Sequence, residues 1–327
     1  MTNSSSERPG EFELIATLFA PLSAKAPGAY ALTDDAATIH LPPGQELVVT
    51  ADLSSAGVHF RPEDPPNLIA KKALRVNLSD LAAKGAVPAG YMLSLALPHD
   101  WTMPWMEAFA AALREDQDEF SIALLGGDTT STSSALTVAI TAFGMLPVGS
   151  MIRRNGAKPG DLVFVSGTIG DAGAGLAVLM GELPNVSPSD RAALVSRYQV
   201  PTPRLGLGHA LRGLATAALD VSDGLLADLG HIAETSDVGL SIDADRVPLS
   251  EALMAAGGPV VAAVAAGDDY EIAFTAPASR REDLQRIASR TGTPVTEIGR
   301  VTSGSGVALL DSSDREIPVS RKGYRHF

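Results

Sequence analysis

The first half of the chain alternates between segments with apolar residues at helical spacing and shorter apolar runs typical of strands. In residues 10–22, apolar side chains recur every three or four positions, which predicts a first helix. The same spacing predicts longer helices over residues 67–86 and 104–120, and Gly85 followed by Pro88 ends the first of these. Apolar runs between the helices predict strands over residues 37–41, 45–53, 89–98, 121–130 and 134–147.

The second half begins after a basic segment that contains Gly and Pro, residues 148–161. Beyond it we expect a strand over residues 162–167, a Gly-rich turn that starts a helix, and later strands and helices. Because both halves mix the two kinds of element, the sequence predicts a two-domain α/β or α+β protein. We place the domains at residues 11–149 and 150–327, after a disordered N-terminus of residues 1–10.

Length and composition support this division. A chain of 327 residues exceeds one ordinary core, and 45% hydrophobic with 19% charged residues is typical of a globular protein. The formal net charge of −13 argues against nonspecific binding to nucleic acid or to an anionic membrane. It still permits a phosphorylated substrate, because divalent cations can lie between acidic side chains and phosphate groups.

Cysteine is absent, which excludes disulfides, thiolate metal sites and a cysteine nucleophile. Six histidines without metal-binding spacing argue against a zinc site. The chain begins without a basic region followed by an apolar run, and Gly257, Gly258 and Pro259 interrupt its most apolar later stretch. We therefore expect a cytoplasmic protein that does not span a membrane.

Two strand-like runs end in aspartate. One ends in Asp52, and the other ends in Gly126, Gly127 and Asp128. Glycine lets the backbone approach a ligand closely, and ligands in α/β folds favour the carboxyl ends of strands. Each stretch taken alone is more often an ordinary turn, because Asp and Gly are common turn residues.

Asp80 is harder to explain as a turn residue. It lies in the helix expected over residues 67–86, which is apolar nearly all round, so we expect its side chain to be buried. A buried carboxylate needs a cation or several hydrogen-bond donors. A capping role and metal binding are equal alternatives at this point.

Further aspartates occupy similar positions. Asp34 and Asp35 stand side by side among small and apolar residues, and Asp220 follows an apolar run. Ser222 and Asp223 precede a helix, where either is a suitable N-cap. Hard oxygen ligands of this kind suit Mg²⁺, and several in one pocket would repel each other unless more than one ion lay between them. A multi-metal site in an enzyme most often handles phosphate.

The absence of certain motifs excludes some classes of nucleotide-binding enzyme. The chain has no P-loop motif and no protein-kinase signature set. Residues 167–176 are Gly-rich and follow a strand, but their glycine spacing differs from the dinucleotide-binding fingerprint. We interpret them mainly as a packing turn at a helix start, with phosphate contact as the second interpretation.

Segments from almost the whole chain carry a resemblance to a known family. They are "GEFELI", "TDDAA", "AGVHF", "KKALRVNLSDLAAKGAVP", "LLGGDTT", "RRNGAKPGD", "VSGTIGDAGAGL", "LDVSDGLLADLGHI", "GDDYEI" and "KGYRHF". The chain resembles the thiamine-monophosphate kinase family, of the aminoimidazole-ribonucleotide-synthetase-like ATP-binding superfamily. Residues 77–86, 126–130 and 220–224, in this order, are specific for the superfamily, and residues 56–60 and 323–327 narrow it to this kinase family.

The resemblance implies a homodimer of two-domain subunits. The N-terminal domain would carry a mixed sheet, bind ATP and Mg²⁺ and form the dimer, and the C-terminal domain would be α/β. It also implies transfer of the γ-phosphoryl group of ATP to thiamine monophosphate, the final step of thiamine diphosphate biosynthesis. Both reactants are polyanions, so the reaction needs their repulsion cancelled and their groups aligned, and little covalent help.

The resemblance also assigns roles to individual residues. It implies Mg²⁺ ligands at Asp35, Thr50, Asp52, Asp80, Asp128, Asp220 and Asp223. Among these, Asp80, Asp128 and Asp220 are the expected catalytic residues. It implies ATP contacts from Gly127, Asp128, Arg154 and Ser222. It places His59, Asp268 and Tyr324 on the substrate side.

The two adjacent aspartates at residues 34 and 35 are expected to differ in role. Asp35 is the metal ligand that the resemblance implies. Asp34 is expected to hold the loop by accepting backbone hydrogen bonds, as aspartates in turns commonly do.

The chain departs from the family pattern at five positions, one of which is Ala266 in place of a usual Gly. Thr33 replaces a usual Gly, and Ala51 replaces a usual hydroxyl residue before the strand-end aspartate. Asp268 is a shorter carboxylate than usual. Arg321 stands where an aromatic residue is common, so Tyr324 is our candidate for stacking on the thiamine rings.

Two other functions compete with the kinase. The first is another enzyme of the same superfamily. Selenophosphate synthetases and hydrogenase-maturation members need Cys or selenocysteine, which this chain lacks. Aminoimidazole-ribonucleotide synthetase stays open, but it would not explain the presence of the motif at residues 56–60. A nucleotide- or metal-sensing protein without catalysis is a different class. The retained aspartates argue against it, and Ala51 argues weakly for it.

Overall fold

The computed structural model describes residues 9–320 and 322–324. The disorder expected over residues 1–10 falls mostly on residues 1–8, which lie outside this description. In the part of the chain that is described, no helix is both long enough and apolar enough to cross a membrane.

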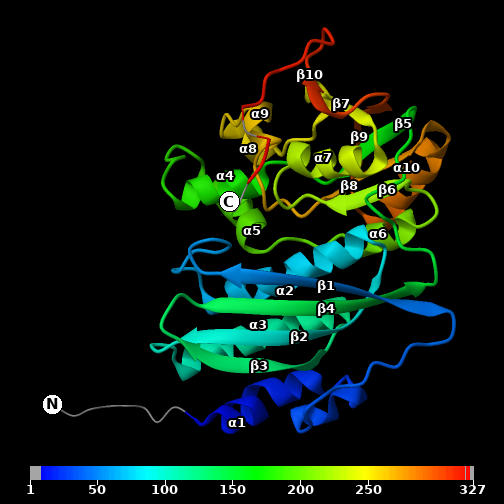
Figure 1. The fold of residues 1–327 in the computed structure, drawn as a ribbon. Helices are drawn as coiled ribbons and strands as arrows, with labels where there is room; N and C mark the ends of the chain where they lie inside the picture. Colours follow the sequence, from blue (N-terminus) through cyan, green and yellow to red (C-terminus); the bar gives the residue numbers. More distant parts are fainter. Residues whose placement is uncertain (1–8, 321, 325–327) are drawn as a thin grey trace. The chain divides into compact units, whose positions relative to one another are not determined.

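The chain divides into two compact units (Figure 1). One comprises the chain up to Leu81 together with Pro88–Leu146, and the other comprises Ala82–Val87 together with the chain from Pro147 onward. The domain limits of 11–149 and 150–327 stay a prediction, and the short segment Ala82–Val87 is where the compact units depart from a simple division along the chain.

The first unit is built on a four-stranded sheet with the order β1-β4-β2-β3. Its strands are β1 (Gln45–Ser55), β2 (Val87–Pro98), β3 (Leu124–Thr132) and β4 (Thr137–Pro147). Strands β2 and β3 run parallel, with Leu93 opposite Gly127 and Ser94 opposite Asp128. Buried residues alternate with half-buried ones along β4, so one face of the sheet packs against a core.

Helices α2 (Pro66–Ala83) and α3 (Met103–Phe120) lie against one face of this sheet (Figure 1). Leu74 and Leu78 of α2 are fully buried, as expected for a helix that is apolar nearly all round. Thr102 caps α3, because its Oγ1 accepts a hydrogen bond from the Trp105 N–H at 3.3 Å. Both helices were predicted from the apolar spacing, and the strands expected over 45–53, 89–98, 121–130 and 134–147 are likewise confirmed.

The N-terminal segment differs from its prediction. The expected helix over residues 10–22 is a succession of short turns of different pitch: α1 (Glu11–Leu14), η1 (Ile15–Phe19) and η2 (Ala20–Ser23). The prediction of a strand over residues 37–41 is wrong, because these residues form no strand. The Thr38 N–H donates to the Gly28 carbonyl at 2.8 Å, next to the turn η3 (Pro27–Leu32), so the backbone there is paired with a helical turn and not with a strand.

The second unit contains a six-stranded sheet with the order β10-β7-β9-β5-β8-β6. Its strands are β5 (Asp161–Ser166), β6 (Ala217–Asp220), β7 (Gly239–Asp243), β8 (Ile272–Pro277), β9 (Val295–Thr302) and β10 (Gly306–Leu310). Strands β7 and β10 are parallel, and the central strands β5, β8 and β9 pair antiparallel. The sheet is therefore mixed, in agreement with the predicted α/β or α+β class.

Helices α7 (Leu225–Ser236), α6 (Leu205–Leu211) and α10 (Arg281–Thr291) pack against the second sheet. Helices α4 (Asp171–Leu179), α5 (Pro188–Gln199), α8 (Glu251–Ala255) and α9 (Val260–Ala263) pack on one another in a further apolar cluster. On β5, Val163 and Val165 join the core beneath α7, while Phe164 joins the core beneath α6 and α10 and stacks on Phe274 with ring centroids 5.3 Å apart. Because successive side chains of a strand point to opposite faces, β5 contributes residues to two separate cores.

A buried ion pair joins the two long helices of the first unit. Arg75 donates from Nε and Nη2 to the two carboxylate oxygens of Asp116 at 2.8 and 2.7 Å. We predict that Asp116→Asn lowers the free energy of unfolding by about 3 kcal/mol, because it leaves a buried guanidinium without its main counter-charge.

Glu119→Gln is the matched control for this prediction. Glu119 also accepts from Arg75 Nη2, at 2.8 Å, but its side chain is 53% exposed. Its loss should cost less than about 1 kcal/mol. Urea unfolding compares the two variants, and equal losses of stability would contradict a dominant buried pair.

Candidate active site

In the first unit, β1 and α2 bring two of the predicted metal ligands together. The Thr50 hydroxyl on β1 donates to Asp80 Oδ2 on α2 at 2.5 Å. Burial, and secondly the charge of Asp80, raises the pKa of Asp52 to about 6. Thr50, Asp52 and Asp80 therefore form one group, in which the two carboxylates repel each other. A divalent cation beside them would remove that repulsion.

The donor set fits Mg²⁺ in a particular way. Among the described residues, no group of three or more acidic or histidine side chains is arranged to enclose a metal ion. Mg²⁺ usually keeps several waters and binds through one or two carboxylates plus substrate phosphates. A pair of carboxylates with a neighbouring hydroxyl suits that mode, in which the phosphates themselves complete the coordination.

A cavity of about 300 Å³ in the same unit is lined by Asp34, Asp35, Gly127 and Asp128. Asp35 and Asp128 are both exposed there. A Cβ on Gly127 would lie 1.7 Å from the Leu93 carbonyl oxygen, so only glycine allows β3 to run this close to β2. Residues that are about 90 positions apart in the sequence thus line one cavity.

Asp34 and Asp35 have separate surroundings within this cavity. Asp34 Oδ1 accepts from the Asp35 N–H at 2.8 Å, so Asp34 holds the loop as the sequence predicted. Thr33, just before this pair, donates through Oγ1 to the Tyr30 carbonyl at 2.7 Å. That bond closes a turn in which Tyr30 has a positive φ of 49°.

His59 lies in a tight turn directly after β1. Its Nδ1 accepts from the Ser55 N–H at 3.1 Å, and the Gly57 N–H donates to the Phe60 carbonyl at 2.8 Å. The turn therefore fixes the imidazole relative to the strand that carries Thr50 and Asp52.

In the second unit, the loop after β6 carries three of the predicted residues. Asp220 ends β6 and is buried, and Ser222 and Asp223 follow it. A single oxygen of Asp228, Oδ2, accepts from the N–H groups of Ser222, Asp223 and Gly224 at 3.0, 3.0 and 3.1 Å. Burial, and next the charge of Asp223, raises the pKa of Asp228 to about 7.

Asp228 was missed by sequence reasoning. It stands in the first turn of α7 and reaches back to the loop before that helix. An acidic residue in a first helical turn is common, so its presence in the sequence does not reveal that it shapes a site.

Other predicted residues meet at the same loop. The Asp268 N–H donates to the Ser222 carbonyl, and the Tyr324 N–H donates to the Asp223 carbonyl, both at 2.8 Å. The Tyr324 side chain is 45% exposed and lines, with Asp223, a cavity of about 850 Å³. The structure therefore brings together all the predicted site residues of the second unit except Arg154.

Arg154 lines a separate, basic pocket. It is exposed beside Lys84 and Arg153 around a cavity of about 450 Å³. The pocket is tied to β6, because Lys84 Nζ donates to the Ala218 carbonyl at 2.8 Å and the Ala218 N–H donates to the Arg153 carbonyl at 2.9 Å. Lys84 is a further cation that sequence reasoning did not single out.

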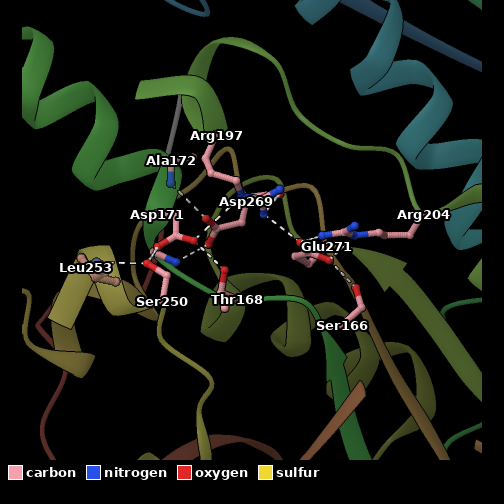
Figure 2. Close-up of polar contacts among 11 residues, drawn as sticks. Ser166, Thr168, Asp171, Ala172, Arg197, Arg204, Ser250, Leu253, Asp269 and Glu271 are labelled. Carbon is pink, nitrogen blue, oxygen red and sulfur yellow. Dashed lines mark hydrogen bonds and ion pairs between the residues drawn. The ribbon is translucent and has the colours of Figure 1, made fainter. Parts of the chain in front are cut away.

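A buried polar cluster surrounds the segment that follows Asp268 (Figure 2). Asp269 and Glu271 are both fully buried. Burial raises the pKa of Asp269 to about 8, against the opposing effect of the backbone N–H groups of Gly170 and Ala172 and of nearby Arg197. Neither carboxyl group was predicted to be structurally important, because their partners lie about 70 to 100 positions away in the sequence.

The family model for the AIR synthase related protein N-terminal domain matches residues 33–146, and that for the C-terminal domain matches residues 158–312. A relative from Caulobacter vibrioides, called thiamine-monophosphate kinase, is 43% identical over 326 residues, covering 97% of this chain and 91% of the relative. The likeness therefore extends over both units.

Two solved structures show the same likeness in three dimensions. Thiamine-monophosphate kinase from Stenotrophomonas maltophilia K279a is 43% identical with a TM-score of 0.78, covering 85% of this chain and 89% of that one. A structure of AaThiL complexed with AMPPCP and TMP is 32% identical with a TM-score of 0.78, covering 97% of both chains.

The raised pKa of Asp269 predicts a pH dependence of stability. Between about pH 4 and pH 8 the folded chain holds a proton that the unfolded chain has released, so this group's contribution to stability falls as the pH rises. Asp269→Asn removes the titration. We predict that the stability of the wild type relative to this variant falls between pH 5 and pH 8, by at most about 1.4 kcal/mol per pH unit. Urea unfolding at several pH values measures it, and a constant difference would contradict the assignment.

Proposed function

The chain belongs to the thiamine-monophosphate kinase family of AIR synthase related proteins, and on that premise we propose that it uses ATP to phosphorylate thiamine monophosphate to thiamine diphosphate. The observation that carries the proposal is the likeness over 97% of both chains to a complex that holds AMPPCP, an ATP analogue, together with TMP. The paired carboxylates on β1 and α2 support it from the chain's own geometry.

Charge neutralisation is the main task in this reaction. Donor and acceptor are both polyanions, so the γ-phosphoryl group and the acceptor phosphate repel each other as they approach in line. Mg²⁺, when bound, would supply positive charge that offsets this repulsion. The acceptor is already an ionised phosphate oxygen, so we assign no general base.

Each unit contributes residues to the proposed roles. In the first unit, Asp80 and Asp52 with Thr50 would hold Mg²⁺, and Asp35 and Asp128 would do so from the shared cavity. In the second unit, Asp220 and Asp223 would hold Mg²⁺. ATP contacts are proposed for Gly127, Asp128, Arg154 and Ser222. Contacts to thiamine monophosphate are proposed for His59, Asp268 and Tyr324.

Two departures from the family pattern bear on these assignments. Exposed and half-buried residues alternate along this part of β1, so Ala51 points to the opposite face from Thr50 and Asp52. The absence of a hydroxyl group at residue 51 therefore does not change the face of β1 that carries Thr50 and Asp52. Arg321 lies outside the described residues, and Tyr324 stays the proposed stacking aromatic because it borders the cavity next to Asp223.

We also infer a homodimer. Val49 and Leu53 are 55% and 60% exposed on the face of β1 that points away from Thr50 and Asp52. Exposed apolar residues on an open sheet face are typical of a surface that another chain covers. A cytoplasmic location follows as a proposal from the use of ATP as co-substrate.

Product analysis tests the function directly. We predict that the purified protein converts thiamine monophosphate to thiamine diphosphate when ATP and Mg²⁺ are both present. Asp80→Asn is the control, because it keeps the side-chain volume but removes the charge that faces Thr50; its turnover should fall by at least about a hundredfold.

Other outcomes of this assay have distinct meanings. Absence of product while AMPPCP still binds would contradict the kinase and favour a nucleotide-sensing protein. Formation of thiamine diphosphate from free thiamine would indicate a pyrophosphokinase instead. Equal turnover of the Asp80→Asn variant would assign Asp80 a purely structural role.

A further inference from the structure

The segment Gly267–Tyr270 has a strained backbone. Asp268 and Tyr270 have φ values of 69° and 50°, in the left-handed region that non-glycine residues rarely adopt. Such conformations persist only where the surrounding structure enforces them, and they concentrate at functional sites. The structure must therefore contain the groups that enforce this one.

One set of groups ties the segment to the loop after β6. The Asp268 N–H donates to the Ser222 carbonyl, and the Tyr270 N–H donates to the Val221 carbonyl, both at 2.8 Å. The Tyr270 hydroxyl donates to Asp268 Oδ1 at 3.2 Å. The position of the Asp268 carboxylate thus depends on the backbone at both Asp268 and Tyr270.

A second set holds the segment from its other side (Figure 2). Arg204 donates from Nε and Nη2 to the two oxygens of Glu271 at 2.7 and 2.5 Å, and Arg197 Nη2 donates to Glu271 Oε1 at 2.7 Å. The same Nη2 of Arg197 donates to the Asp269 carbonyl at 3.2 Å. The Asp269 carboxyl group accepts from the N–H groups of Gly170 and Ala172.

Burying these charged side chains costs free energy, so their arrangement calls for a role beyond stability. Glu271 is fully buried, and a buried ion pair is often no more stabilising than apolar side chains of the same volume. Glu271 also needs glycine beside it, because a Cβ on Gly167 would lie 2.1 Å from Glu271 Oε1. Fixed geometry, more than stability, accounts for two arginines converging on one buried carboxylate.

We propose that Arg197, Arg204, Asp269 and Glu271 are positioning residues for the substrate. Together they form a clamp that holds Asp268 in its strained conformation and thereby sets the affinity for thiamine monophosphate. This inference rests on the proposed function, in which Asp268 contacts that substrate.

Arg197→Lys and Arg204→Lys test the clamp, because lysine keeps the charge but loses the planar fork that binds two acceptors. Each variant should raise the KM for thiamine monophosphate about tenfold, since small displacements of a positioned group have effects of this order. In an Asp268→Asn background the same substitutions should raise KM less than about twofold, because the group through which they act is gone.

Arg281→Lys is the matched control. Arg281 makes the same forked contact with Glu297, at 2.7 and 2.9 Å, but on the exposed surface of the second unit. It should leave KM unchanged. Thermal unfolding of every variant checks folding, and Arg204→Lys stands in if Arg197→Lys does not fold.

Failures of the two proposals can be told apart. A wild type that does not phosphorylate thiamine monophosphate would overturn the proposed function, and the clamp's role toward this substrate with it. An active wild type whose arginine variants lose only thermal stability, with KM unchanged, would overturn the clamp alone. The clamp would also be overturned if the arginine substitutions raised KM by the same factor with and without the Asp268→Asn change.

Discussion

Repulsion between like charges is the constraint on which the candidate site depends. Asp52 and Asp80 come from different elements, yet the fold places them close together, so that burial and then the charge of Asp80 raise the pKa of Asp52. In the described part of the chain, neither carboxylate forms an ion pair with Lys or Arg, and the Thr50 hydroxyl donates to Asp80. Such an arrangement is unfavourable by itself and becomes favourable when a divalent cation joins it.

The buried carboxyl groups of the second unit are satisfied differently. Asp228 accepts three backbone N–H groups, Asp269 accepts two, and two arginines surround Glu271. These groups complete their hydrogen bonds within the protein, so they suit a structural role. Asp80 accepts the Thr50 hydroxyl, but among the described residues neither Asp52 nor Asp80 has a cationic partner, which suits groups that bind a ligand. The contrast separates carboxylates that shape the site from those proposed to work in it.

The sequence predicted the elements better than the contacts between them. Long amphipathic or apolar periods identified α2 and α3, and runs ending in Asp52 and Asp128 identified the strands that carry candidate ligands. The strand expected over residues 37–41 failed because its backbone pairs with a helical turn, a tertiary contact that local pattern does not encode.

The same limit applies to the site. Asp35, Asp80, Asp128 and Asp223 stood out because acidic residues interrupt apolar segments there, and because their motifs resemble a known family. Asp228 and Glu271 did not stand out, since their importance arises from backbone N–H groups and arginines that only the folded chain brings near. The sequence pattern thus identified residues that are proposed to bind a ligand. It did not identify the residues that hold them in place.

Calorimetric titration with AMPPCP, in Mg²⁺ and again in excess EDTA, measures whether nucleotide binding depends on divalent cations. If the carboxylates need divalent cations to accept a polyanion, AMPPCP should bind in Mg²⁺ and show no measurable binding in EDTA. Equal affinity under both conditions would contradict the account, because the phosphates would then be held by the protein's own cations alone.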